Sequence, residues 1–167
     1  MGVRGLFLIA FVLMISSAAF AAQEVEIGTY ILNIGEYEIE KGAYKADFYL
    51  WFYWDGEIKP DTFEIMNGEV TSKDVIVDEP GWLFYRIHAN LHESPDLHNY
   101  PKDIQTLAIK IEDSYHSTES MYYVPNHEEI GLGEDLEIRN WNFASVEAEV
   151  TDQYYANWDE TYSRYTH

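Results

Sequence analysis

The chain has 167 residues, no cysteine and a formal net charge of −20, from 10 Lys and Arg against 30 Asp and Glu. Nucleic acids and anionic membrane surfaces are therefore poor partners, because phosphate groups bind to clusters of lysine and arginine. Without cysteine, the domain must be held by side-chain packing and strand pairing alone. The 14 Tyr and 5 Trp favour strands and binding surfaces.

The N-terminus has the features of a secretory signal. Arg4 precedes an unbroken apolar run over residues 6–15, and Ala19-Phe20-Ala21 fits the small-x-small cleavage pattern. These features predict a signal peptide over residues 1–22, with an uncleaved anchor as the alternative. No later apolar stretch approaches the roughly 20 residues that a membrane helix needs. Residues 23–167 are expected to form one domain, secreted or held on the extracellular or periplasmic face of a membrane.

The first two expected strands are Val25–Asn33 and Tyr44–Trp54. The second alternates clearly, because successive side chains of a strand point to opposite faces. One face carries Phe48, Leu50, Phe52 and Trp54, and the other carries Tyr49, Trp51 and Tyr53. Since both faces are apolar or aromatic, we expect both to be covered, by a second sheet or by a partner.

Short strands separated by turns continue to the end of the chain. Asp55-Gly56 and Asn67-Gly68 are turn signals. Strands are expected over residues 74–77, 81–91, 105–112, 136–143 and 145–155, and a last one begins at Tyr162. In the 105–112 strand, Leu107, Ile109 and Ile111 are expected to point inward, and Ala108, Lys110 and Glu112 outward. No helical period of useful length occurs, so the pattern predicts an all-β sandwich or barrel.

One segment resembles a known family. Tyr100-Pro101-Lys102-Asp103-Ile104-Gln105 is similar to the aromatic-Pro-Phe-Asp-x-Gln motif of the pentameric ligand-gated ion channels, with Lys102 in place of Phe. The preceding residues 94–99 resemble the loop body of the Cys-free prokaryotic members. Glu93 and Leu107 stand where the eukaryotic members carry the disulfide of this signature loop.

Other blocks match that family in the same order. They are residues 44–55 with Trp54, Pro60-Asp61 followed by Asn67, residues 136–141 with Trp141, and Tyr162-Ser163-Arg164. The resemblance spans about Val25 to His167 and implies the immunoglobulin-like β-sandwich of the family's extracellular ligand-binding domain. It also implies that the final strand is incomplete and that the four membrane helices of a full-length channel are missing.

The resemblance implies two sets of functional residues. The coupling loop at the membrane end would contain Tyr100, Pro101, Asp103 and Gln105, with Asp103 pairing an arginine beyond this chain. The ligand would bind between neighbouring subunits of a homopentamer, in a box of aromatic side chains. By position, its residues would be Tyr49, Trp51, Met66, Tyr115, Tyr154, Tyr155 and Trp158.

The expected ligand is a small cationic amine. Aromatic ring faces attract cations, each good contact contributing about 0.5–2 kcal/mol, and the negative net charge would steer a cation toward the domain. A simpler reading is that Tyr49 and Trp51 form the second face of a sandwich core.

Other chemistry has little support. His88 and His92 are spaced as zinc ligands on a helix would be, but on a strand they lie about 13 Å apart. No metal site or cofactor is therefore expected. The chain has no cysteine nucleophile, no G-x-S-x-G motif and no phosphate-binding glycine loop, which argues against an enzyme.

Three functions remain. The first is the ligand-binding domain of a channel that gates ion flow only in a full-length form. The second is a secreted, soluble ligand-binding protein without a pore. The third is an unrelated secreted carbohydrate-binding β-sandwich.

Overall fold

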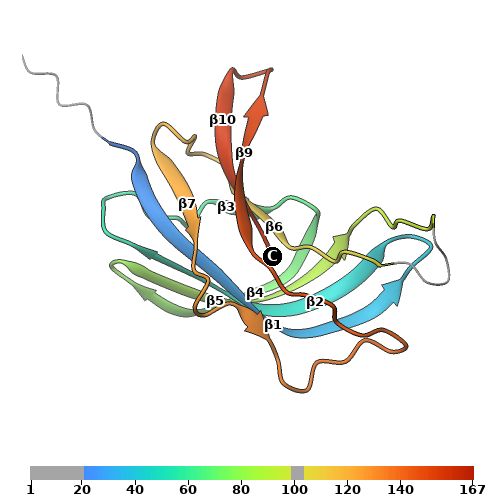
Figure 1. The fold of residues 1–167 in the computed structure, drawn as a ribbon. Helices are drawn as coiled ribbons and strands as arrows, with labels where there is room; N and C mark the ends of the chain where they lie inside the picture. Colours follow the sequence, from blue (N-terminus) through green and yellow to red (C-terminus); the bar gives the residue numbers. More distant parts are fainter. Residues whose placement is uncertain (1–20, 99–103) are drawn as a thin grey trace, which may run out of the picture.

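The computed structural model describes residues 21–98 and 104–167, which form ten strands in two sheets and no helix (Figure 1). The predicted signal peptide lies almost entirely outside the described residues. The larger sheet contains β1 (Gln23–Glu38), β2 (Ala43–Trp54), β4 (Gly68–Glu79), β5 (Trp82–His92), β7 (Met121–Pro125) and β8 (Gly131–Leu132). The smaller sheet contains β3 (Phe63–Ile65), β6 (Lys110–Asp113), β9 (Glu149–Tyr155) and β10 (Glu160–Thr166). The all-β prediction is confirmed.

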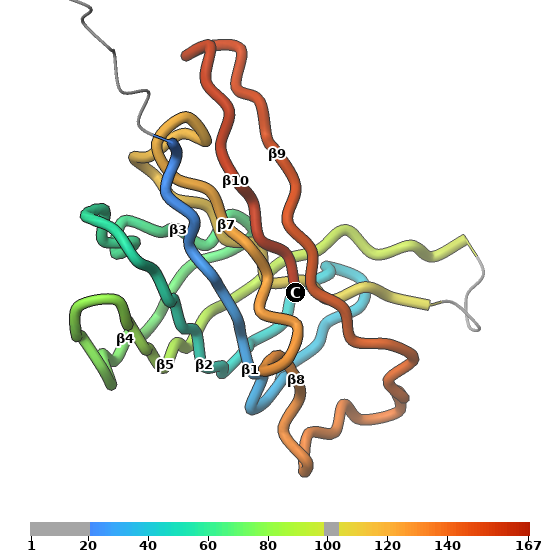
Figure 2. The backbone as a smooth tube through the Cα atoms, turned by 60° about the vertical axis from the view of Figure 1, so that its left-hand side comes forward, coloured from blue at the N-terminus to red at the C-terminus, as the bar shows by residue number. Residues whose placement is uncertain are grey.

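The strand order is β4-β5-β2-β1-β7 in the larger sheet, with β8 also on β1, and β3-β6-β10-β9 in the smaller. The tube in Figure 2 shows β9 and β10 running side by side, with β2 and β5 of the larger sheet lower in the view. Short connections make β1 and β2, β4 and β5, and β9 and β10 antiparallel neighbours. Longer connections bring β7 and β8 back parallel to β1.

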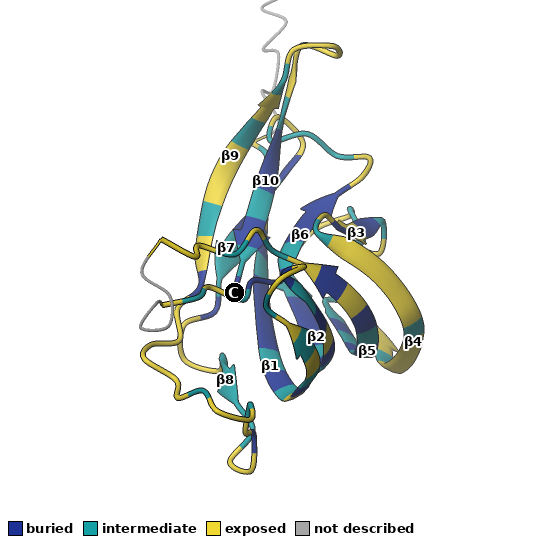
Figure 3. Ribbon diagram, turned by 90° about the vertical axis from the view of Figure 1, so that its right-hand side faces the viewer, coloured by how far each residue is buried: buried dark blue, intermediate teal, exposed yellow. Residues whose placement is uncertain are grey.

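The core lies between the two sheets, as the dark strands of Figure 3 show. Its fully buried apolar side chains come mostly from alternate positions of facing strands: Val25, Ile27, Phe48, Leu50, Phe52, Leu83, Ile87, Ile109, Ile111, Met121 and Tyr165. The predicted face of Phe48, Leu50, Phe52 and Trp54 is thus the inner one, with the first three fully buried and Trp54 partly buried against the core.

A buried polar contact ties the two sheets together. The Thr29 hydroxyl of β1 lies 3.1 Å from the Tyr165 hydroxyl of β10 and also hydrogen-bonds His167 Nδ1. The backbone of His167 exchanges two hydrogen bonds with Ile109, at 2.7 and 3.1 Å. Burial lowers the pKa of His167 to about 4, so its imidazole is neutral inside the fold at pH 7.

The predicted strand over residues 136–143 is wrong. Leu136 is buried and Ile138 packs against the core. The backbone, however, turns at Asn140, whose φ is 68°, and the Trp141 N–H donates to the Ile138 carbonyl. The apolar spacing there reflects packing of Trp141 against Tyr37, with ring centroids 5.7 Å apart, and not strand pairing.

The 105–112 prediction is only partly right, because the strand is limited to Lys110–Asp113. Ile109 and Ile111 are buried as expected. Ala108 and Glu112, expected to point to solvent, are buried as well. Glu112 lies on the outer face of the smaller sheet but is covered there by side chains of β9 and β10.

The connection between β5 and β6 is closed without a disulfide. The Gln105 amide spans it, accepting from the Asp96 N–H at 3.0 Å and donating to the Asp96 carbonyl at 2.5 Å. Glu93 forms an ion pair with Lys110 at 2.8 Å. Tyr100, Pro101 and Asp103 lie outside the described residues, so their coupling role stays a prediction. Within the described ranges, no helix could cross a membrane.

The buried His167 should make the fold acid-sensitive. In the unfolded chain its imidazole protonates near pH 6.5, whereas in the fold it stays neutral down to about pH 4. Its contribution to stability is therefore full above pH 6.5 and is lost as the pH falls toward 4. Between pH 7 and pH 4, we expect the free energy of unfolding measured in urea to fall by about 3 kcal/mol more in the wild type than in H167Q. Identical pH dependence of the two proteins would contradict this expectation.

Candidate ligand site

Six aromatic side chains lie close together on the outer face of the larger sheet. They line a shallow hollow of about 260 Å³ together with Glu129, and we call this surface the aromatic face: Tyr30, Tyr49, Trp51, Tyr53, Trp82 and Phe84. Strand register brings them together, because Tyr30 lies opposite Tyr49, Trp51 opposite Phe84, and Tyr53 opposite Trp82. The rings of Trp82 stack with those of Tyr53 and Phe84 at centroid distances of 6.2 and 6.4 Å.

Trp51 packs against a glycine of the neighbouring strand. Gly28 is its partner on β1, and a Cβ there would lie 2.4 Å from the indole. The indole fills the space that this missing side chain leaves, and Trp51 is only 6% exposed. The indole N–H groups of Trp51 and Trp82 have no hydrogen-bond acceptor within the described chain. The expected ligand residue is thus also a packing residue of its own sheet.

The aromatic face ends in an ion pair. On the same face, Arg86 of β5 donates to both carboxylate oxygens of Asp47 on β2, at 3.1 and 2.7 Å. His88 Nδ1 lies 3.6 Å from the same carboxylate. Since Asp47 neutralises Arg86, the arginine beside the aromatic rings presents no unpaired positive charge.

A second aromatic group lies on the β9–β10 hairpin, which extends beyond the sandwich in Figure 1. The Tyr155 ring lies 5.6 Å from the Trp158 ring and 5.7 Å from the Tyr162 ring. We call these three residues the hairpin cluster. Trp158 is 66% exposed and Tyr162 is buried, so the cluster presents one open ring above two supported ones.

A buried carboxylate supports the hairpin cluster. Glu112 on β6 accepts hydrogen bonds from the Tyr155 hydroxyl, at 2.9 and 3.2 Å, and from Arg164 Nε. Arg164 also donates to the Tyr155 hydroxyl at 3.1 Å. Burial, and then the neighbouring Glu112, raise the pKa of Tyr155, so its hydroxyl stays protonated. Tyr155 is the last residue of β9 before the turn of the hairpin, and the closed network fixes its ring there and neutralises Arg164.

The two aromatic groups cannot form one box within a chain. The aromatic face is on the outer side of the larger sheet. Arg164 and Glu112 pair across the smaller sheet, and their neighbours Ile111 and Tyr165 point into the core. The hairpin cluster is therefore on the outer side of the smaller sheet, and the outer faces of two packed sheets point in opposite directions.

The other predicted ligand residues are not brought together. Tyr154, beside Tyr155, points to the opposite face of β9 and donates to Asp159 at 2.8 Å. Tyr115 follows β6 and is 77% exposed. Met66 follows β3, and its N–H donates to the Lys110 carbonyl. These three residues line neither the aromatic-face hollow nor the hairpin cluster.

Sequence reasoning did not single out several members of the two groups as ligand residues: Tyr30, Tyr53, Trp82, Phe84, Glu112, Tyr162 and Arg164. For β5 the sequence contained a usable pattern, because Trp82 and Phe84 occupy alternate positions of their strand, as Tyr49 and Trp51 do in β2. Tyr30 and Glu112 depend on which strands become neighbours, so no local pattern could identify them. Within the described residues, no group of three or more His, Asp or Glu side chains is arranged to hold a metal ion.

No family model matches the sequence, and no curated protein matches it significantly. Among solved structures, the acetylcholine-binding protein of Bulinus truncatus superposes with a TM-score of 0.65 at 16% identity. The match covers 87% of this chain and 85% of that chain. The chain has the fold of an acetylcholine-binding protein. The predicted β-sandwich of the ligand-gated channel extracellular domain type is thus confirmed.

The packing of Trp51 against Gly28 can be tested by substituting the glycine. In G28A, the added methyl group would overlap the Trp51 indole and force it outward, because all three atoms nearest to the new Cβ belong to that indole. We expect the free energy of unfolding in urea to fall by about 1–3 kcal/mol and the tryptophan emission to shift toward longer wavelength. The matched control is G35A on the same strand, where the nearest atom to an added Cβ is 3.9 Å away. Equal losses in both variants would show that Trp51 does not depend on Gly28.

Proposed function

We propose that this chain is an extracellular ligand-binding domain of the pentameric ligand-gated channel type, which binds a small cationic amine between neighbouring copies. It would act on the extracellular or periplasmic side of a membrane, or as a secreted protein. The fold it shares with an acetylcholine-binding protein supports a binding role. In a longer chain with membrane helices the same domain would gate ion flow, and without them it would be a soluble binding protein.

The placement of the two aromatic groups carries this proposal. Each is half of an enclosure, and each faces away from the other across the sandwich. Head-to-tail contact would bring the hairpin cluster of one copy against the aromatic face of the next. A contact between different surfaces of identical chains closes into a ring when the rotation allows it, and a ring of five is the arrangement that we propose.

A cation suits the enclosure better than an anion. The rings offer electron-rich faces, and Glu129 lies at the edge of the aromatic face. Arg86 and Arg164, the arginines next to the two groups, are paired with Asp47 and Glu112. Anionic ligands would therefore find no unpaired arginine beside the rings, and the net charge of −20 would repel them.

Oligomeric state is the first measurement. Native mass spectrometry and sedimentation velocity of residues 23–167 should show a pentamer in equilibrium with smaller species. Adding choline should shift that equilibrium toward the pentamer, because a ligand that binds only between copies favours assembly. A protein that stays monomeric at high concentration, with and without choline, would contradict assembly through these surfaces.

The hairpin offers a matched pair of variants. Y155A removes a ring of the hairpin cluster, whereas Y154A removes a neighbouring ring on the opposite face. By isothermal titration calorimetry, we expect choline to bind about tenfold more weakly to Y155A and with unchanged affinity to Y154A.

The charge of the ligand is tested in the same assay. Choline should bind more tightly than 3,3-dimethyl-1-butanol, its uncharged isostere, because only choline carries a cation for the rings. Equal affinities would contradict the cationic class. Binding to insoluble polysaccharide, lost in W158A, would instead support a carbohydrate-binding sandwich.

A further inference from the structure

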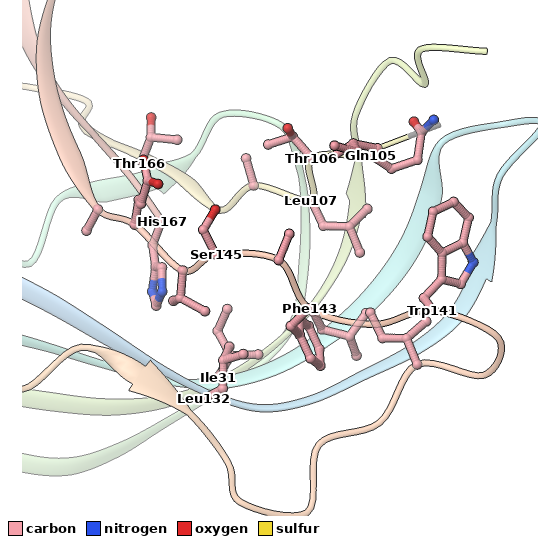
Figure 4. A pocket seen from close by; sticks show the side chains of 18 of the residues that line it. Ile31, Gln105, Thr106, Leu107, Leu132, Trp141, Phe143, Ser145, Thr166 and His167 are labelled. Carbon is pink, nitrogen blue, oxygen red and sulfur yellow. The ribbon is translucent and has the colours of Figure 1, made fainter. Parts of the chain in front are cut away.

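A second, larger cavity lies inside the sandwich. Its volume is about 460 Å³, and it lies where the ends of the two sheets separate. Ile31 and Leu132 line one side, Leu107 another, and residues 141–149, up to the first residue of β9, the third. Figure 4 shows these side chains gathered around an open space, with Thr166 and His167 of the β10 end at one side. The aromatic face and the hairpin cluster contribute no residue to it.

The segment that covers this cavity is unusual. Residues 133–148 join β8 to β9 and contain no strand, although irregular connections longer than about 12–15 residues are uncommon in compact domains. Phe143 and Val146 in this segment are 44% and 40% exposed. Both also line the cavity. The cavity mouth is thus edged by apolar side chains that a bound apolar molecule would cover.

The charge of the lining decides the ligand class. The lining contains no lysine or arginine, and its only acidic residues are Glu147 and Glu149, both exposed. Neither glutamate forms an ion pair within the described chain. A carboxylate or phosphate would meet these acidic groups without a positive partner. Fatty acids and other anionic amphiphiles are therefore disfavoured, whereas uncharged molecules are not.

The volume of the cavity limits the size of the molecule that it can bind. An engineered core cavity of about 150 Å³ stays dry and binds benzene, and this cavity has about three times that volume. Pockets of roughly 300–1,000 Å³ are typical of small-molecule sites. The lining combines apolar side chains with uncharged polar ones such as Gln105, Asn142 and Ser145. A molecule of two or three rings, or an aliphatic chain of similar bulk, matches this volume and would cover the apolar part of the lining.

We propose that the space between the sheets, closed by residues 133–148, is a binding site for an uncharged apolar small molecule of two to three rings. The site is separate from the inter-copy enclosure, and it is complete within one chain. It therefore goes beyond the proposed function and does not depend on assembly.

The test uses N-phenyl-1-naphthylamine, an uncharged three-ring dye that fluoresces when it leaves water. It should bind saturably to residues 23–167 at neutral pH, and decanoate should compete poorly. In S145F, a ring is added at an exposed cavity-lining position (Figure 4), and the affinity for the dye should fall about tenfold or more. The control V75F adds a ring at an exposed position of β4 outside the cavity and should leave the affinity unchanged.

A second variant keeps the test valid if S145F does not fold. V146D places a charge at the cavity mouth and should also weaken dye binding about tenfold or more, with an unchanged circular dichroism spectrum. Unaltered dye affinity in folded S145F and V146D would overturn the proposal. So would loss of dye binding in W82A alone, because it would place the dye on the aromatic face. Strong competition by decanoate would overturn the uncharged class.

Discussion

Strand β2 must be covered on both faces, and much of the molecule follows from that constraint. Successive side chains point to opposite sides, so packing Phe48 and Phe52 into the core places Tyr49 and Trp51 on the outside. A second sheet covers the inner face, where Phe48 and Phe52 have no exposed area. The outer face has only neighbouring rings and the gap above Gly28. The remaining aromatic surface is half-covered, which is an arrangement suited to a partner copy.

The sequence was sufficient where structure is set by neighbours along the chain. Alternation in β2 identified both faces correctly, and turn residues such as Asn67-Gly68 separated the strands. It failed where the outcome depends on distant partners. Glu112 was expected in solvent because it alternates with Ile111, yet Tyr155 and Arg164 from a hairpin far along the chain bury it. The packing of Trp51 against Gly28 likewise depends on the register between β1 and β2, which the sequence of a single strand does not determine.

The candidate site shows the same division. Family resemblance placed Tyr155 and Trp158 on a hairpin, and the structure brings their rings together. It also included Tyr154, which alternation alone would have placed on the other face. The third ring, Tyr162, comes from the returning strand. The members of the hairpin cluster can therefore be identified only from the register between β9 and β10. Carrying over positions one by one from a family does not provide that register.

Strand β10 connects the features of this domain. Tyr162 and Arg164 point outward to the hairpin cluster, Tyr165 points inward to Thr29, and Thr166 and His167 line the inner cavity. Strand β10 and the residue after it thus contribute to the hairpin cluster, the sheet-to-sheet contact and the cavity between the sheets. Occupancy of one site would alter affinity at the other only if β10 had two arrangements that the ligands prefer unequally. The buried Thr29–Tyr165 hydrogen bond opposes such a shift, because breaking it would leave unsatisfied polar groups between the sheets. On these contacts, we expect the two proposed sites to be occupied independently of each other.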